Sequence, residues 1–174
     1  MCVALAALDA SVNVVGPDGE RSIPFSAFHR LPGDEPQHDN TMRHGELITS
    51  IEIPSCDFGP NHTYLKVRDR LSYAFALVSV AAALRTEAGV IKKARVALGG
   101  VAHKPWRDRA AEEAIVGLEP ATAAFRAFAD RVLSPAQGRG QNDFKIELAR
   151  RTIVRALQQA AAGTPQRQSD KSIH

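Results

Sequence analysis

The strongest constraint on the fold is the apolar run of residues 74–85, which is followed by a turn at residues 86–89 and a second apolar run at residues 90–100. At about 12 residues the first run is too short for a membrane span, which takes about 20. Its alanines favour a helix, whereas Val78, Val80 and the turn favour a strand. We therefore predict that the two runs are strands joined as a hairpin.

Three more segments have the alternation of strands. Residues 10–15 and 20–25 flank a Gly-Pro-Asp-Gly turn and predict a second hairpin. Residues 45–54 predict a strand that Pro54 terminates. Residues 63–67 predict a short strand that joins the hairpin of residues 74–100 in a three-stranded antiparallel sheet.

The character of the chain changes after Pro105, where helical spacing replaces alternation. We predict helices at residues 108–115, 120–133 and 144–162. Asn142 and Asp143 are candidate caps of the last helix, and Gly163 is its predicted end. The polar tail of residues 163–174 is predicted to be disordered.

Charge and cysteine usage narrow the class of protein. The net charge is only +3 and the basic residues are scattered, so we expect no nucleic-acid partner. Cys2 and Cys56 form no metal-binding spacing, and we expect free thiols that are buried or half-exposed, in a reducing compartment. Residues 1–8 are apolar without a basic start, which is a poor signal peptide and indicates a segment inside a folded unit. This start favours a truncated or internally started reading frame.

No catalytic arrangement stands out in the sequence. No serine lies in a nucleophile elbow, and no two histidines have the i, i+4 spacing of a metal site. Gly99 and Gly100 follow a strand without opening a helix, so they predict a sharp turn or close packing and not a phosphate site. Glu112 and Glu113 lie in the first turn of a helix, where they suit the helix dipole, and neither is assigned as an acid or base.

A charged cluster at the end of the strand of residues 63–67 has two interpretations. Lys66, Arg68 and Arg70 would hold a flavin or its phosphate through charge-assisted hydrogen bonds. Alternatively, Asp69 pairs with a neighbouring arginine at the surface, which contributes little. Taken alone, the cluster favours the surface pair.

Three stretches in series are similar to a known family. They are Gly45-Glu46-Leu47-Ile48-Thr49-Ser50-Ile51-Glu52-Ile53-Pro54, residues 64–81 and residues 98–107. In this order and spacing they resemble the medium, FAD-binding subunit of molybdenum hydroxylases, of the xanthine dehydrogenase and periplasmic aldehyde oxidoreductase type. The likeness extends from Met1 to about Ala162.

The resemblance implies an α+β fold in two parts. Residues 1–57 would be the C-terminal remnant of an FAD-binding domain of the vanillyl-alcohol-oxidase type. Residues 62–162 would be a domain like the C-terminal one of CO dehydrogenase flavoproteins, with a three-stranded antiparallel sheet and a helical bundle. Residues 163–174 would follow as the disordered tail.

The resemblance also implies an oxidoreductase subunit that relays electrons. Its FAD would receive them from the iron–sulfur clusters of a small subunit and pass them to an external acceptor, while the molybdenum cofactor of a large subunit hydroxylates the substrate. Lys66, Ile48, Arg70 and Tyr73 fall at positions that border the flavin in the family. The resemblance assigns no catalytic residue and no metal ligand in this chain.

The chain departs from the family pattern in its first part. The family's glycine-rich phosphate loop, and the Ser-Asp pair expected before Met1, are not among its 174 residues. Cys2 and Cys56 do not match the family's iron–sulfur ligands. We therefore expect an incomplete FAD site, weak flavin binding and an inactive isolated chain, in the cytoplasm or the periplasm, without membrane insertion. The alternative is a flavin-free module that docks partner subunits.

Overall fold

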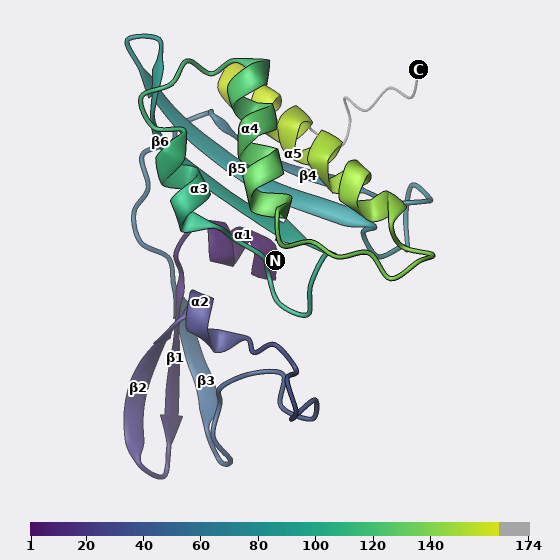
Figure 1. Ribbon diagram of the computed structural model, residues 1–174. Helices are drawn as coiled ribbons and strands as arrows, with labels where there is room; N and C mark the ends of the chain where they lie inside the picture. The colour runs from purple at the N-terminus through teal and green to yellow at the C-terminus, as the bar shows by residue number, and fades with distance from the viewer. Residues whose placement is uncertain (164–174) are drawn as a thin grey trace.

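The computed structural model describes residues 1–163, so the predicted disordered tail lies outside the described residues, except for Gly163. Two three-stranded antiparallel sheets form the frame, with strand orders β2-β1-β3 and β4-β5-β6 (Figure 1). The α+β class expected from the sequence is confirmed. Within residues 1–163, no helix is both long and apolar enough to cross a membrane.

The first sheet is built from the predicted hairpin and the strand before Pro54. β1 (Ser11–Gly16) pairs with β2 (Gly19–Pro24) on one side and with β3 (Leu47–Glu52) on the other. A short helix, α2 (Phe25–Phe28), follows β2. β3 is an edge strand and every one of its residues is exposed.

The second sheet contains the apolar run whose structure was ambiguous in the sequence. It consists of β4 (His62–Val67), β5 (Val78–Glu87) and β6 (Val90–Gly99), so the strand prediction is confirmed over the helix. The predicted start at Ala74 is wrong by four residues, because residues 74–77 belong to the β4–β5 loop. The ladder ends where Val67 pairs with Val78, and Leu77 N donates to Val67 O at 2.9 Å.

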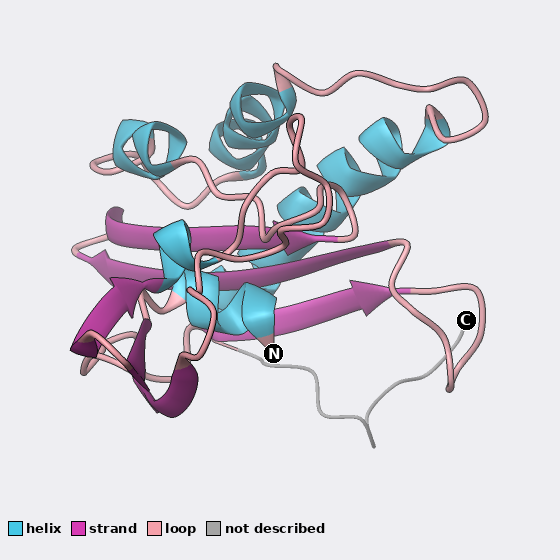
Figure 2. Ribbon diagram, turned by 90° about the horizontal axis from the view of Figure 1, so that it is seen from below, coloured by secondary structure: helices cyan, strands magenta, loops and turns pink. Residues whose placement is uncertain are grey.

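Three helices cover one face of the second sheet: α3 (Arg109–Ala114), α4 (Thr122–Leu133) and α5 (Phe144–Ala162) (Figure 2). The core between them contains fully buried side chains from both layers, among them Phe125, Phe128, Ile153, Leu157, Val80, Leu84 and Leu98. Gly163 ends α5 in the left-handed conformation, with φ +65°, as predicted.

Asp143 occupies the predicted N-cap position of α5, but neither candidate makes a side-chain cap hydrogen bond. Asn142 Oδ1 accepts a hydrogen bond from Arg139 N at 2.7 Å, and Asp143 Oδ1 accepts one from Gly140 N at 2.9 Å. Both side chains therefore turn back to the preceding loop instead of satisfying the first amides of the helix. Each side chain instead accepts from the backbone amide three residues before it in the loop.

The other face of the second sheet is partly covered by α1 (Cys2–Ala7), a helix that the sequence analysis did not predict. Leu5, Ala6 and Ala7 share a buried cluster with Ala81 of β5 and Ala97 of β6. The same cluster continues into the first sheet, so α1 connects the two sheets through a shared core. Small alanine side chains on the sheet allow this close approach of a helix.

Charged side chains reinforce the connection. Asp9, just after α1, accepts a hydrogen bond from Arg107 Nη1 at 2.6 Å, and it forms ion pairs with Arg95 Nη1 at 2.6 Å and with Arg109. Arg107 Nη1 also donates to Ala6 O at 2.7 Å. The pairs with Arg107 and Arg95 are largely sheltered, since these two side chains are only 11% and 16% exposed.

Candidate functional site

Lys66 lies near the end of β4, on the sheet face opposite the three helices. Side chains along a strand alternate between the two faces of the sheet. Leu65 packs into the core on the helix side, so the adjacent Lys66 points to the other face. The Lys66 Nζ donates to Ala74 O at 2.9 Å, across the β4–β5 loop. An ammonium has three donors, so this bond holds the loop and leaves two donors for another group.

The β4–β5 loop exposes large apolar side chains. Tyr73 is 96% exposed and Phe75 is 97% exposed, while Leu71 is 69% exposed. Tyr73 also has φ +53°, a left-handed conformation that is uncommon for a residue other than glycine. A cluster of this kind indicates a surface that contacts another molecule.

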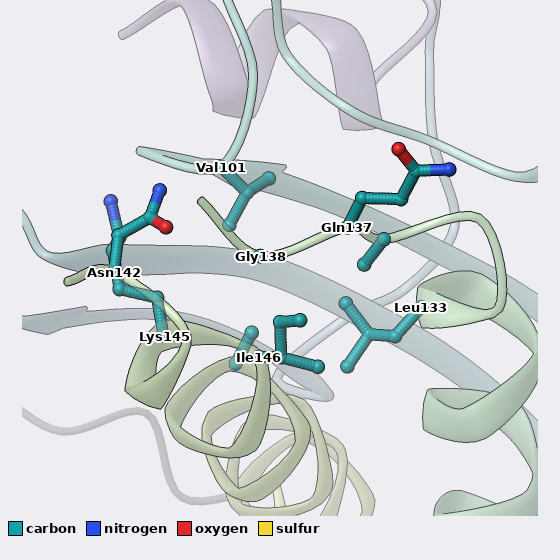
Figure 3. A pocket seen from close by; sticks show the side chains of 9 residues that line it. Val101, Leu133, Gln137, Gly138, Asn142, Lys145 and Ile146 are labelled. Carbon is teal, nitrogen blue, oxygen red and sulfur yellow. The ribbon is translucent and has the colours of Figure 1, made fainter. Parts of the chain in front are cut away.

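The turn at Gly99–Gly100 packs closely against this loop, which confirms the prediction of a sharp turn with close packing. Gly100 has φ +78°, and a Cβ there would lie 2.8 Å from Leu77 O and 3.0 Å from Ala76 O. On the other side, Lys145 Nζ of α5 donates to Gly100 O at 2.6 Å. Figure 3 shows Lys145, with Asn142 beside it, at the edge of a small pocket of about 120 Å³ below Val101.

The charged cluster beside Lys66 does not form the surface pair that the sequence favoured. Among residues 1–163, Asp69 has no ion pair with Arg68 or Arg70. Arg70 is exposed and Arg68 is half-buried. The guanidinium groups are therefore available to an external anion, although the geometry does not identify one.

Ile48 lies in the other sheet, on β3, where it pairs with Val14 of β1. It is 42% exposed, and its apolar neighbours Leu47 and Ile51 are 68% and 44% exposed. Neither Ile48 nor Lys66 lines any of five well-formed pockets in the described part of the chain. The same holds for Arg70 and Tyr73, so the structure brings Lys66 close to the Tyr73 loop but does not gather all four residues in one pocket.

An apolar pocket that the sequence analysis missed lies on the same sheet face as Lys66. It has a volume of about 460 Å³, with a floor of Ala81 and Ala83 and walls from α1, Phe58 and Tyr64. The Tyr64 hydroxyl donates to Ser79 Oγ at 3.2 Å. Alternation within β4 and β5 would have placed these side chains on one face, but the wall from α1 required the tertiary structure.

The described residues contain no group of three or more histidine, cysteine or acidic side chains that could hold a metal ion. Cys2 and Cys56 are free, as expected, but both are exposed and not buried or half-exposed. Cys2 begins a short helix and Cys56 lies in the connection between β3 and β4, where little chain surrounds either thiol.

Glu112 has a structural role that its position at a helix start did not indicate. Glu112 is only 6% exposed. Its carboxylate accepts a hydrogen bond from Val96 N at 2.7 Å, which links α3 to β6. Arg107 donates to the same carboxylate. Its neighbour Glu113 is exposed.

Two family models match the chain. The model described as CO dehydrogenase flavoprotein C-terminal domain matches residues 62–160, and the one described as FAD binding domain in molybdopterin dehydrogenase matches residues 1–56. Together they follow the two-part order expected from the sequence.

Named proteins match along nearly the whole chain. The aldehyde oxidoreductase FAD-binding subunit PaoB of Escherichia coli is 42% identical over 163 residues, which are 93% of this chain and 48% of that protein. The glyceraldehyde dehydrogenase medium chain of Sulfolobus acidocaldarius is 30% identical over 92% of this chain and 56% of that protein. The chain thus spans about half the length of these relatives.

A solved structure has the same fold. The carbon monoxide dehydrogenase of Hydrogenophaga pseudoflava matches with a TM-score of 0.81 and 26% identity, over 93% of this chain and 56% of that one. The matched residues 62–160 make up more than half of the present chain. The chain therefore belongs to the family of CO dehydrogenase flavoprotein C-terminal domains.

Proposed function

We propose that this chain is part of the FAD-binding, electron-transfer subunit of a molybdenum-containing oxidoreductase of the xanthine or aldehyde dehydrogenase type. The observation that carries the proposal is the match of both parts of the chain, in order, to the FAD-binding and C-terminal domains of such flavoproteins. The 42% identity to an aldehyde oxidoreductase FAD-binding subunit supports it. When bound, FAD accepts and releases electrons, and the protein positions and tunes it.

Within this function, Lys66, Arg70, Tyr73 and Ile48 are the proposed flavin-contacting residues. Lys66 has two spare donors beside the Tyr73 loop, and Tyr73 and Ile48 present apolar surface that a flat ring would cover. Arg70 adds an exposed cation in the β4–β5 loop, between Lys66 and Tyr73 in the sequence. In this proposal Lys66, Arg70 and Tyr73 border the flavin from the second sheet and Ile48 from the first, and they hold, orient and shield the ring without taking part in its redox chemistry.

The proposed partners are a molybdenum-binding large subunit and an iron–sulfur small subunit, which deliver electrons to the flavin before an external acceptor removes them. Both the cytoplasm and the periplasm suit such an assembly, and fractionation of the native host would distinguish them. We also propose residues 1–57 and 62–162 as the two domains. The separate sheets support this division, although α1 joins them through a shared core.

A flavin titration tests the proposal. The chain alone, titrated with FAD and followed by flavin absorbance, should bind weakly, because its proposed contacts lie on two separate sheets and share no pocket among those described above. A chimaera in which this chain replaces the matching segment of the E. coli subunit should bind FAD stoichiometrically. If a correctly folded chimaera purifies without flavin, the proposed function is wrong.

The second candidate function is a flavin-free module that docks partner subunits. The exposed apolar residues of β3 and of the β4–β5 loop favour it, because large exposed apolar side chains mark protein interfaces as well as ligand sites. Co-purification of the chain with a molybdenum subunit, without flavin colour in either the chain or the chimaera, would support the docking function over the first proposal.

A further inference from the structure

A pocket of about 370 Å³ lies where α2 meets the chain segment after β6. Its walls are mostly apolar and aromatic, and its polar side chains are Ser26, His29, Lys104 and Arg107. Pockets of about 300–1,000 Å³ with apolar walls and a few polar groups are typical of small-molecule sites.

The charge of this pocket is positive and only partly compensated. No carboxylate lines it. Arg107 is already paired with Asp9 and Glu112, so its charge is balanced. Lys104 makes no hydrogen bond or ion pair within residues 1–163 that would balance its own. An anion that enters the pocket would therefore meet one uncompensated ammonium.

His29 adds an unsatisfied polar atom. Its Nδ1 is the one buried side-chain nitrogen or oxygen in the described part of the chain that has no hydrogen-bond partner. Buried polar atoms of this kind call for an explanation, such as an absent ligand. The ring lies edge-on to Phe25 and Phe28, with centroids 5.1 and 5.0 Å away. These two rings hold the imidazole in place at the pocket wall.

The electrostatic field at His29 also favours an anion. Burial and the positive charge of Lys104 lower the pKa of His29, and Asp39 opposes them. A bound anion would offset the field of Lys104. Trp106 and Pro105 also line the pocket and supply flat apolar surface for the rest of such a ligand.

We propose that this pocket binds a small aromatic carboxylate, with the carboxylate at Lys104 and His29 and the ring against Trp106 and Pro105. The site shares no residue with the proposed flavin contacts Lys66, Ile48, Arg70 and Tyr73. It does not depend on the proposed function, and a chain that binds no flavin would still be expected to bind the carboxylate.

The sequence supplies a reporter, because Trp106 is its single tryptophan and lines the pocket. The full chain is titrated with benzoate, and tryptophan fluorescence, corrected for ligand absorbance, is followed to saturation. Benzamide, which keeps the ring and lacks the charge, should bind at least about tenfold more weakly. Lys104→Ala should weaken benzoate binding by about tenfold or more, and Lys104→Arg should retain it.

Lys92→Ala, which removes an exposed lysine from β6, is the matched control and should bind benzoate as the parent does. Circular dichroism of each variant checks that it is folded, and Lys104→Arg keeps the charge if Lys104→Ala does not fold. Saturable benzoate binding that depends on the charge at residue 104 supports the site. Absence of saturation, equal binding of benzamide, or a folded Lys104→Ala variant with unchanged affinity each overturns it.

Discussion

Arg107 donates two hydrogen bonds to the buried carboxylate of Glu112, from Nε at 2.7 Å and from Nη2 at 2.8 Å. The third guanidinium nitrogen reaches Asp9 and the carbonyl of Ala6. One side chain therefore links the end of α1, the segment after β6 and the start of α3. Removal of Glu112 leaves this buried cation half-paired and the amide of Val96 without its acceptor.

Glu112→Ala should accordingly lower the free energy of unfolding by about 3 kcal/mol, in the range found when one partner of a buried ion pair is removed. Chemical denaturation followed by circular dichroism measures it. Glu113→Ala removes an exposed carboxylate from the adjacent position and should change stability by less than about 0.5 kcal/mol. If both substitutions lowered the free energy of unfolding by the same amount, the buried contacts of Glu112 would contribute nothing to stability.

Gly100→Ala should destabilise the protein more than the same change at another glycine with positive φ. Gly117 has φ +87°, and a methyl group added there would have no atom within 4 Å, so Gly117→Ala reports the backbone cost alone, about 1–2 kcal/mol. At Gly100 the methyl group also meets two carbonyl oxygens of the β4–β5 loop, which adds about 1–3 kcal/mol. Urea denaturation of both variants gives the difference, and equal losses would contradict close packing at this turn.

Glu46 should make stability depend on pH in acid. Hydrogen bonds from Arg21 and from the amide of Arg43 lower its pKa from 4.5 to about 2. The stabilisation is fully present above the unfolded-state pKa of 4.5 and is lost as pH falls through about 2. Glu46→Gln should therefore be less stable than the parent at neutral pH, and the two should converge in acid. Glu52→Gln, at an exposed position on β3, should parallel the parent, and thermal melts across this pH range compare all three.

Lys66→Ala in the chimaeric FAD subunit should reduce the flavin content or the rate of flavin reduction, because it removes a proposed contact and the bond to Ala74 O. Lys66→Arg retains the positive charge and should restore part of the flavin content. Flavin absorbance per protein and stopped-flow reduction in the assembled enzyme measure the two effects. Full FAD content and full turnover in Lys66→Ala would contradict a flavin contact, and Lys66 would then only bond to the β4–β5 loop.

Local sequence patterns were sufficient to predict the positions of most strands and helices. Alternation located five of the six strands within two residues, and apolar residues at helical spacing located α3, α4 and α5. The exception was β5, where apolar character continued upstream through a loop and hid the start of the strand at Val78. Hydrophobicity indicated burial there, but Tyr73 and Phe75 are almost fully exposed.

Features that depend on long-range contacts were not predictable. α1 has only six residues and no side-chain cap, so its helix is stabilised by the Ala81 and Ala97 surface and not by its own sequence. Asp9 and Arg107 are 98 residues apart, and nothing local marks them as partners. The pocket that contains His29 and Trp106 likewise joins two segments that only the tertiary structure brings together.

The candidate flavin contacts came from the resemblance and remain a prediction. In the structure Lys66 is bonded to the loop that carries Tyr73. It separates Ile48 onto another sheet. A cofactor site assembled from several chain segments leaves no periodic signal in any one of them, which is why residue patterns alone favoured a surface ion pair at Lys66.

The bare outer edge of β3 has a practical consequence for anyone who prepares this polypeptide. An unpaired strand with isoleucine and leucine on its faces is a template on which further chains stack, so concentrated samples are expected to precipitate through this edge. A lysine in place of Thr49 would introduce a charge into the middle of the strand and should keep the material in solution.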